Sequence, residues 1–362
     1  MKKSFIIILP FLIVMFFSCD PKIEEKKINE KMLFNSGFEG DSRWVVTEGT
    51  SQNERITGTD DSVLPPNNWD KFCTTNANNR YPQLGQFTVY YEGGDVTSRK
   101  ARLVADPLNP DNTALYFAIY SPNVIDVDTE MPQKCRIEAQ VGAVRPAIYN
   151  LYQKVKVMFP SRSMDVLKYY PASYTWFTVA ELWNDRPTNK QDDKYVFRVS
   201  VNIGHDEGAE NPFFFTMSAD TFVPVLDENY QVTDYESTRI KQFYNRDFVI
   251  PFDNWMTLEY YIRDGNEIAN EDKKAGHFYM AITPDGGEKV VLFNERMATH
   301  HPADNESDGL TNWQPMKMYT YKEIGYFMQD RGQPLEIFWD DFVLYTDKIP
   351  EDQELVNKLT AN

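Results

Sequence analysis

The chain has 362 residues and a net charge of -17, with 42% hydrophobic, 25% charged and 14% aromatic residues. This composition is that of a folded protein with a sizeable core, and it excludes a disordered chain. The negative charge repels phosphate backbones and argues against a nucleic-acid partner. Three cysteines and four histidines are too few for a cysteine-rich zinc site.

The N-terminus has the layout of an export signal over residues 1–18, in which two lysines precede an apolar stretch that ends at Phe17. Cys19 follows after one serine, and this arrangement resembles a bacterial lipoprotein signal of the Bacteroidetes type. The resemblance implies that Cys19 carries the lipid, palmitate included, and that the protein is an outer-membrane lipoprotein facing the periplasm or the cell surface. The alternative is an ordinary signal peptide with an incidental cysteine. Residues 19–33 are polar and predict a solvated tether.

The body of the chain, residues 34–346, predicts a single all-β domain. Apolar and polar residues alternate in short segments between clusters of Gly, Pro, Asn and Asp, and no helical periodicity stands out. This pattern is typical of a two-sheet sandwich or jelly roll. Residues 347–362 read as a polar C-terminal tail with room for a short helix. The predicted strands are 136–141, 151–159, 196–203, 256–264, 276–283 and 339–345.

Two cysteines remain in the predicted exported domain, Cys73 and Cys135. An oxidising compartment permits a disulfide between them. The alternative is two buried free thiols, and the sequence does not decide between the two.

The strand faces opposite the core carry basic, acidic, amide and aromatic side chains together. A polar outer face with cross-strand ion pairs explains any one strand. For several strands jointly, we predict a concave face that binds a ligand, because aromatic rings stack on sugars while Arg and Lys pair with carboxylate or sulfate. The candidate substrate-binding residues are Arg136, Glu138, Gln140, Lys154, Lys156, Glu181, Trp183 and Arg198.

The order of motifs across residues 34–346 resembles the concanavalin-A-like jelly roll of secreted polysaccharide lyases, the alginate, glucuronan and heparin lyase type. The resemblance implies a two-sheet β-jelly roll that acts on an acidic poly- or oligosaccharide and requires no cofactor. The segments that carry the resemblance are Arg136–Glu138, Phe177–Asn184, Phe252–Trp255 with Gly276–Tyr279, Ile324–Gln329 as a strand, and Asp340–Leu344 as the closing strand.

The chain departs from the family pattern at two of these motifs. Glu181 stands where the family has Gln, and Trp183 stands where it has His. In the Ile324–Gln329 segment, Phe327 takes the Tyr position and Tyr326 lies one residue away. The usual set of lyase residues is therefore not reproduced.

β-Elimination from a uronic acid needs a base, an acid and a group that neutralises the carboxylate. If residues 256–264 and 276–283 pair as a hairpin, one face carries two tyrosines, a histidine and an arginine together. A structural role is the alternative for each histidine. The candidate catalytic residues are His277, Tyr279, Tyr261 and Arg263, then His205 together with Arg136, and Tyr326 from the family motif.

The resemblance and these residues predict a carbon–oxygen lyase for uronic-acid-containing saccharides. The enzyme would be a polysaccharide lyase or an oligosaccharide dehydratase in the degradation of algal polymers such as ulvan, acting as a monomer. The alternative is a glycan-binding surface lipoprotein without activity, in which Trp183, Trp176 and Tyr174 are stacking platforms.

A structural calcium ion is a separate prediction. The segment Asn35–Glu39 resembles the first strand of carbohydrate-binding jelly rolls, where a Glu and an Asp of the closing strand share Ca²⁺. The ligands here would be Glu39 with Asp340 or Asp341, as hard oxygen donors. The alternative is an acidic pair without a metal.

Overall fold

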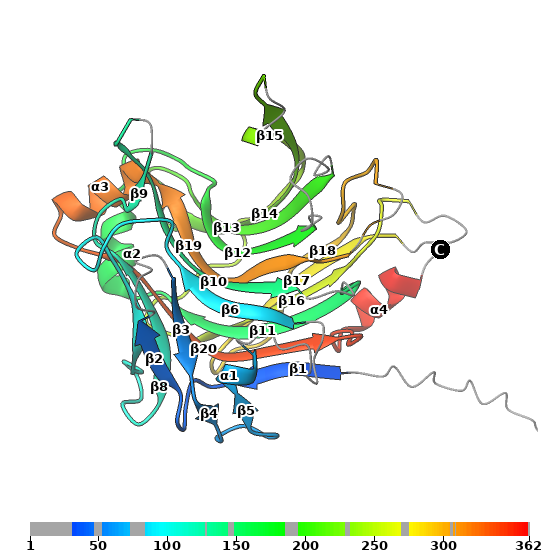
Figure 1. Ribbon diagram of the computed structural model, residues 1–362, viewed down its shortest axis with the longest axis horizontal. Helices are drawn as coiled ribbons and strands as arrows, with labels where there is room; N and C mark the ends of the chain where they lie inside the picture. The colour runs from blue at the N-terminus through cyan, green and yellow to red at the C-terminus, as the bar shows by residue number, and fades with distance from the viewer. Residues whose placement is uncertain are drawn as a thin grey trace, which may run out of the picture.

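Two antiparallel β-sheets pack face to face in a β-jelly roll, as the sequence predicts (Figure 1). Four short helices accompany them in the part of the chain that the structure describes. The computed structural model describes residues 31–46, 53–72, 84–126, 129–143, 148–184, 195–228, 232–268, 275–304, 307 and 309–360. The predicted signal, Cys19 and nearly all of the tether lie outside these ranges.

The first sheet, called sheet A here, is built around β11 and β20. β20 pairs with β11 on one side and with both β8 and β1 on the other. The strands in spatial order are β18 (Val290–Arg296), β17 (His277–Pro284), β16 (Met256–Arg263), β11 (Asn150–Met158), β20 (Leu335–Thr346), β8 (Thr113–Ile119) and β7 (Arg99–Ala105), with β1 (Lys31–Ser36) beside β20.

The second sheet, sheet B, has β12, β19 and β10 at its centre. Figure 1 shows β12, β13 and β14 bowed, with the inner side of the bend turned away from sheet A. The strands in spatial order are β15 (Val232–Asn245), β14 (Phe213–Leu226), β13 (Val196–His205), β12 (Phe177–Asn184), β19 (Asn312–Tyr321), β10 (Pro132–Ala143), β6 (Leu84–Tyr90), β3 (Asn53–Thr57) and β2 (Arg43–Val46), with β9 (Val124–Ile125) on β10; β4 (Thr59–Asp60) and β5 (Asn67–Asn68) form a separate pair.

The core lies between the sheets and follows the predicted alternation. In β13, Val199, Val201 and Ile203 are fully buried in the core cluster, because successive side chains of a strand point to opposite faces. Burying a side chain of this size stabilises the fold by about 1.5–3 kcal/mol relative to its exposure. Trp313 and Trp339 are fully buried members of the same cluster.

The helices are α1 (Trp69–Phe72), α2 (Ser161–Leu167), α3 (Lys322–Asp330) and α4 (Gln353–Thr360). The prediction of a strand over Ile324–Gln329 is wrong, because this segment is most of α3. Its buried residues Ile324, Phe327 and Met328 are three and four positions apart, which puts them on one face of a helix. No helix in the described ranges is both long and apolar enough to cross a membrane.

Cys135 lies buried on β10, and burial raises the pKa of its thiol to about 12. Its sulfur lies 3.7 Å from the carbonyl oxygen of Tyr321. Cys73 lies outside the described residues, so the predicted pairing of the two cysteines stays a prediction.

Candidate functional site

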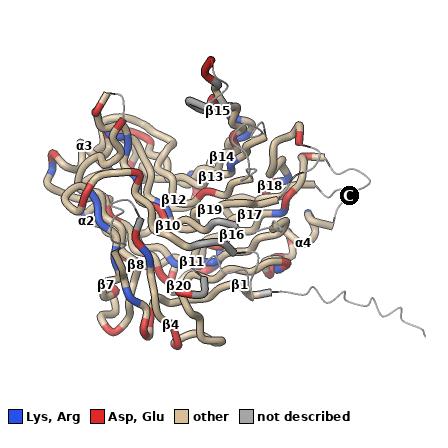
Figure 2. The backbone as a smooth tube through the Cα atoms, in the orientation of Figure 1, with Lys and Arg blue, Asp and Glu red and all other residues tan. Residues whose placement is uncertain are grey.

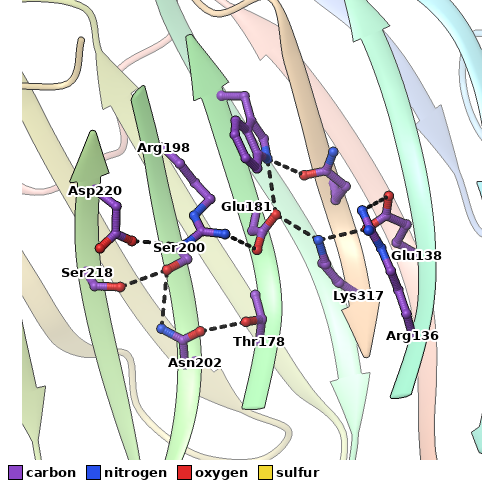
Figure 3. A network of polar contacts seen from close by, with 12 residues as sticks. Arg136, Glu138, Thr178, Glu181, Arg198, Ser200, Asn202, Ser218, Asp220 and Lys317 are labelled. Atoms are coloured by element: carbon purple, nitrogen blue, oxygen red, sulfur yellow. Dashed lines mark hydrogen bonds and ion pairs between the residues drawn. The ribbon is translucent and has the colours of Figure 1, made fainter. Parts of the chain in front are cut away.

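A row of alternating charges crosses sheet B on the face turned away from the core (Figure 3). Its centre is Lys317 on β19, whose Nζ lies 2.7 Å from Glu138 Oε2 on β10 and 2.7 Å from Glu181 Oε2 on β12. These three side chains are at most 1% exposed. Ions this deeply buried are tolerated only when each has an opposite partner, so Lys317 holds the centre of the sheet face together.

The row continues from Glu181 toward the edge strand β15. Arg198 lies 3.3 Å from Glu181 Oε1 and 3.1 Å from Asp220 Oδ2. Arg239 on β15 closes this end, with its Nε 3.1 Å from Asp220 Oδ1.

At the other end, Arg136 makes two bonds to Glu138, 3.0 Å from Nε and 2.9 Å from Nη2, and a third bond to Glu92. Burial opposes its charge, but Glu138 and Glu92 outweigh burial, and the pKa of Arg136 is raised. Four acidic and four basic groups thus alternate from Glu92 to Arg239. We call these eight residues the charged row.

The charge of Glu181 is fixed by its neighbours. Burial alone would raise the pKa of this carboxyl group, but Lys317 and Arg198 outweigh burial and lower the pKa to about 2. A carboxylate with such a pKa stays ionised at neutral pH and is a poor proton acceptor. Glu181 is therefore suited to hold cations in place and not to act as a general base.

Neutral hydrogen bonds tie the strands of the same face together (Figure 3). Ser200 and Ser218 hydroxyls lie 2.8 Å apart, and Thr178 donates to Asn202 Oδ1 at 2.7 Å. All four residues are buried, so the part of the face beside the charged row is also rigidly paired.

Two aromatic groups flank the charged row. In the first, the Trp183 indole N–H donates to Glu181 and to Gln314 at 3.0 Å each, and Arg198 lies 5.3 Å from the centre of the Trp183 ring. Trp183 stands where the resembled family has a histidine. Its N–H can donate but cannot accept a proton, so Trp183 cannot act as a base as the family's histidine could.

The second group surrounds Tyr319, which lies directly opposite Arg136 in the β10–β19 register. The centre of its ring lies 4.7 Å from Lys317 Nζ, 5.1 Å from the Arg136 guanidinium and 5.6 Å from Lys134 Nζ. Lys134 has no carboxylate partner among the described residues. Figure 2 shows acidic and basic positions spread over the molecule. Arg136 and Lys317 are paired with carboxylates of the charged row, so Lys134 is the cation that brings an uncompensated positive charge to this phenol.

The predicted group of Tyr261, Arg263, His277 and Tyr279 does assemble. β16 and β17 pair with Tyr261 opposite Tyr279 and Arg263 opposite His277. The group lies on the outer face of sheet A, however, on the other side of the sandwich from the charged row. It does not share a surface with Arg136.

Helix α4 covers this outer face. Leu355 of α4 packs against Tyr152, Tyr261 and Tyr279. The Tyr279 hydroxyl donates to Asp352 at 3.0 Å, and Arg263 donates to a backbone oxygen of the helix.

His277 is fully buried beneath this cover. Its Nε2 lies 2.7 Å from Asn294 Oδ1, and burial lowers its pKa to about 4, with smaller contributions from nearby cations. The arrangement is that of a packed interior, so it does not favour the predicted catalytic role of this group.

Lys154 and Lys156 also lie on the outer face of sheet A. Lys154 lies 3.9 Å from Glu259, and Lys156 lies 3.0 Å from Asp341. The prediction that both lysines join Arg136 and Arg198 in one groove is therefore wrong. The reason is that alternation separates the core side of a strand from its outer side but does not tell which of the two sheets the strand joins. β11 joins sheet A, whereas β10 and β13 join sheet B.

Two more histidines, His205 and His300, also lie away from the charged row. His205 lies on the core side of β13, opposite in direction to Arg198, and its ring nitrogens lie 3.0 and 3.1 Å from two carbonyl oxygens. The predicted partnership of His205 with Arg136 does not occur. His300 is buried against Asp264, with 3.0 Å between Nδ1 and the carboxylate.

Two further residues from the sequence prediction, Tyr326 and Gln140, are not part of the charged row. Tyr326 lies on α3 and is 39% exposed, because its segment is a helix and not a strand. Gln140 lies where the β10–β19 register shifts, one residue past Ala139.

The predicted calcium ligands are engaged in protein contacts. Glu39 accepts from the backbone and hydroxyl of Thr113, and Asp340 accepts from Asn112 at 2.8 Å. Burial, together with Asp341, raises the pKa of Asp340 to about 7. Within the described ranges, no three His, Cys, Asp or Glu side chains are arranged to hold a metal, so calcium gains no support from the geometry.

The sequence reasoning missed Lys317, Tyr319 and Asp220. The signal for the first two was present in the run Asn312–Tyr321, where Met316 and Met318 alternate with Lys317 and Tyr319. A lysine and a tyrosine on the polar face of a central strand mark the same kind of surface as Arg136 and Glu138.

No family model matches the chain, and no curated protein is similar to it in sequence. Solved structures give low-scoring matches. The marine alginate lyase from Aplysia kurodai is 11% identical, with 71% of this chain and 90% of that chain covered and a TM-score of 0.38. The alginate lyase from a Chlorella virus is 10% identical, with 69% and 90% covered and a TM-score of 0.34. LamAcat from Zobellia galactanivorans is 8% identical, with 71% and 94% covered and a TM-score of 0.29.

Proposed function

We propose that the polar face of sheet B binds an acidic poly- or oligosaccharide and cleaves a carbon–oxygen bond in it by β-elimination. The observation that carries the proposal is the position of Tyr319 opposite Arg136 and beside Lys134. A uronate carboxylate held by Lys134 would lie next to a phenol, which is one of the side chains that move protons in such reactions.

Three residues of this face, Lys134, Tyr319 and Trp183, have distinct roles in the proposed reaction. Lys134, which has no ion pair among the described residues, neutralises the substrate carboxylate. This neutralisation makes the proton at C5 more acidic. Tyr319, as the phenolate, takes that proton while the C4–C5 double bond forms and the C4–O bond breaks, and the phenol so formed returns the proton to the oxygen that leaves C4. Trp183 supplies a stacking surface for a neighbouring sugar.

The charged row keeps these groups in position. Arg136 is tied to Glu138 and Glu92, and Lys317 is tied to Glu138 and Glu181. Their side chains are therefore fixed before a ligand arrives, which lowers the entropic cost of binding and of reaction.

An ultraviolet assay tests the proposal, because elimination creates a conjugated, absorbing uronate whether a sugar or water leaves. The substrates are alginate, glucuronan, heparinoids, ulvan and oligosaccharides prepared from each. Sizing the products separates a lyase, which shortens the chain, from a dehydratase, which does not. A rise in absorbance that disappears in Tyr319→Phe supports the proposal, and a rise that persists in this variant contradicts the assignment of Tyr319.

A second function is favoured by the pairing within the charged row. Each of its carboxylates has a cationic partner, and His205, His277 and His300 lie away from the row. A face of this kind can bind a glycan without reacting with it. Binding measured by calorimetry without any rise in absorbance would establish this binding function in place of the lyase.

We propose export as a lipoprotein, with the lipid on Cys19, for both functions, because a lyase and a glycan-binding protein would each meet glycans outside the cytoplasm. Metabolic labelling with a tagged palmitate tests it. The label should appear on the wild type and be absent from Cys19→Ala.

A further inference from the structure

A cavity of about 400 Å³ lies at the end of β19, beyond the charged row. We call it the tyrosine pocket. Its lining includes Tyr170, Ser173, Tyr174, Asp206, Tyr321 and Glu323.

The tyrosine pocket adjoins the proposed saccharide site. Tyr321 follows Tyr319 by two residues on β19, so both side chains leave the same face of the strand, about 7 Å apart. The ring of Trp176 lies edge-on to both, with centroids 4.8 Å from Tyr319 and 4.4 Å from Tyr321. A saccharide bound at Tyr319 would therefore extend along these rings into the pocket.

The pocket offers aromatic surface and hydroxyl groups. Burial, with Glu323 adding to it, raises the pKa values of Tyr170 and Tyr321, so both phenols stay protonated. Tyr174 also lines the pocket but is only 7% exposed, its hydroxyl is buried and its ring stacks on His205, so the hydroxyl groups open to a ligand are those of Tyr170 and Tyr321. Rings with neutral hydroxyl groups are suited to stack on a sugar and to exchange hydrogen bonds with it.

The charge of the pocket is opposite to that of the site beside it. Asp206 is neutralised by Arg246, whose Nε lies 2.8 Å away. Glu323 has no ion pair among the described residues and leaves a negative charge at the rim. Lys134 lies opposite Tyr321 in the β10–β19 register, but in the proposed site it is taken by the uronate, and Arg239 is tied to Asp220. A second carboxylate or sulfate would therefore meet the negative charge of Glu323, whereas an uncharged sugar would not.

We propose that the tyrosine pocket is a second saccharide subsite, which takes an uncharged sugar next to the uronate held at Lys134 and Tyr319. This inference rests on the proposed function and narrows its substrate class to chains in which acidic and neutral sugars are neighbours. Sulfation of the neighbouring sugar weakens its binding, and a chain of uronates alone is a poor ligand.

Two matched probes test the subsite by calorimetry, which needs no turnover. Glucuronan oligosaccharides contain glucuronate alone, and hyaluronan oligosaccharides of the same length alternate glucuronate with uncharged N-acetylglucosamine. The wild type should bind the hyaluronan oligosaccharides about tenfold more tightly. Equal affinities, or tighter binding of the glucuronan oligosaccharides, would overturn the inference.

Single substitutions test whether residues of the tyrosine pocket cause the preference for hyaluronan over glucuronan oligosaccharides. Tyr321→Ala should weaken binding of the hyaluronan oligosaccharides roughly fivefold to tenfold, because it removes a stacking ring. Glu323→Gln should strengthen binding of the glucuronan oligosaccharides about twofold to fivefold, the range of an exposed charge interaction. Tyr326→Ala is the control, since Tyr326 is an exposed tyrosine on α3 that does not line the pocket.

The same titrations separate the inference from the proposed function. If Lys134→Ala weakens both probes while Tyr321→Ala has no more effect than Tyr326→Ala, the subsite is wrong and the uronate site stands. If Lys134→Ala changes neither probe, or if neither probe binds the wild type, the proposed function fails and the subsite fails with it.

Discussion

The two outward faces of the sandwich carry similar residues and differ in what lies over them. The polar face of sheet B pairs its charges sideways, from Arg239 to Glu92, and no described helix packs along it as α4 packs on sheet A. The outer face of sheet A packs Tyr261 and Tyr279 beneath Leu355 of α4. One face is a fixed polar surface beside two aromatic groups, and on the other the tyrosines are packed under a helix as in an interior.

The difference teaches that residue type and strand alternation do not identify a ligand site. His277, Tyr279 and Arg263 form a plausible catalytic group by composition, yet an eight-residue helix excludes solvent from it. Tyr319 and Lys134 have a less suggestive composition, but they lie on the polar face of sheet B, where we propose the saccharide site. The following experiments compare the two faces directly.

The largest expected effect concerns the two tyrosines. Tyr319→Phe removes the proposed proton-transfer group and should lower the elimination rate roughly 10²- to 10⁴-fold. Tyr279→Phe removes the equivalent hydroxyl from the covered face and should leave the rate within about a factor of three, since the ring still packs under α4. Initial rates from ultraviolet absorbance measure both variants, and equal losses would contradict the assignment of the two faces.

The next largest effect concerns stability. Lys317→Met leaves Glu138 and Glu181 buried without their shared cation, and should lower the free energy of unfolding by about 3–5 kcal/mol. Lys154→Met on the outer face breaks a longer and partly exposed pair, and should cost less than about 1 kcal/mol. Urea unfolding measures both. A loss below about 1 kcal/mol for Lys317→Met would show that the charged row is not a cooperative unit.

The two faces should also respond to acid in different pH ranges. His277 has a pKa of about 4 when folded and 6.5 as its ordinary value, so the unfolded state binds more protons between these values. Stability should therefore fall as the pH is lowered from 6.5 to 4, by up to about 3 kcal/mol. Urea unfolding at several pH values should show this slope, and His277→Gln should flatten it.

Acid acts on sheet B at lower pH. The folded pKa of Glu181 is about 2 and its ordinary value is 4.5, so the stability that its charge contributes is complete above 4.5. This stability is lost as the pH falls toward 2, by up to about 3 kcal/mol. Hydrogen exchange should accordingly show α4 opening at a higher pH than β12. Simultaneous opening would contradict the separation of the two faces.

Much of the fold could be predicted from the sequence because alternation with a period of two is a local property. It predicted the core side of β13 and, if β16 and β17 form the hairpin that the structure shows, that Tyr261, Arg263, His277 and Tyr279 share one face. Helix α3 was missed because its residues were compared with a strand motif, although Ile324, Phe327 and Met328 have helical spacing.

The site could be predicted only in part. Arg136, Glu138, Glu181, Trp183 and Arg198 were expected to lie together, and they do meet on sheet B. Lys154 and Lys156 lie on the outer face of sheet A and not on sheet B, because their strand β11 joins sheet A. That α4 covers His277 depends on a contact between segments about 80 residues apart in the chain. Neither is a local property of the sequence.

The most direct test of the central claim compares two lysines in one titration. Lys134 lies beside Tyr319 on the polar face of sheet B, and Lys154 lies on the outer face of sheet A. Calorimetry with hyaluronan oligosaccharides should show that Lys134→Ala weakens binding about tenfold, as expected for loss of a charged hydrogen bond to a carboxylate, while Lys154→Ala leaves the affinity unchanged. Weaker binding in Lys154→Ala together with unchanged binding in Lys134→Ala would contradict the account and place the saccharide site on the other face of the sandwich.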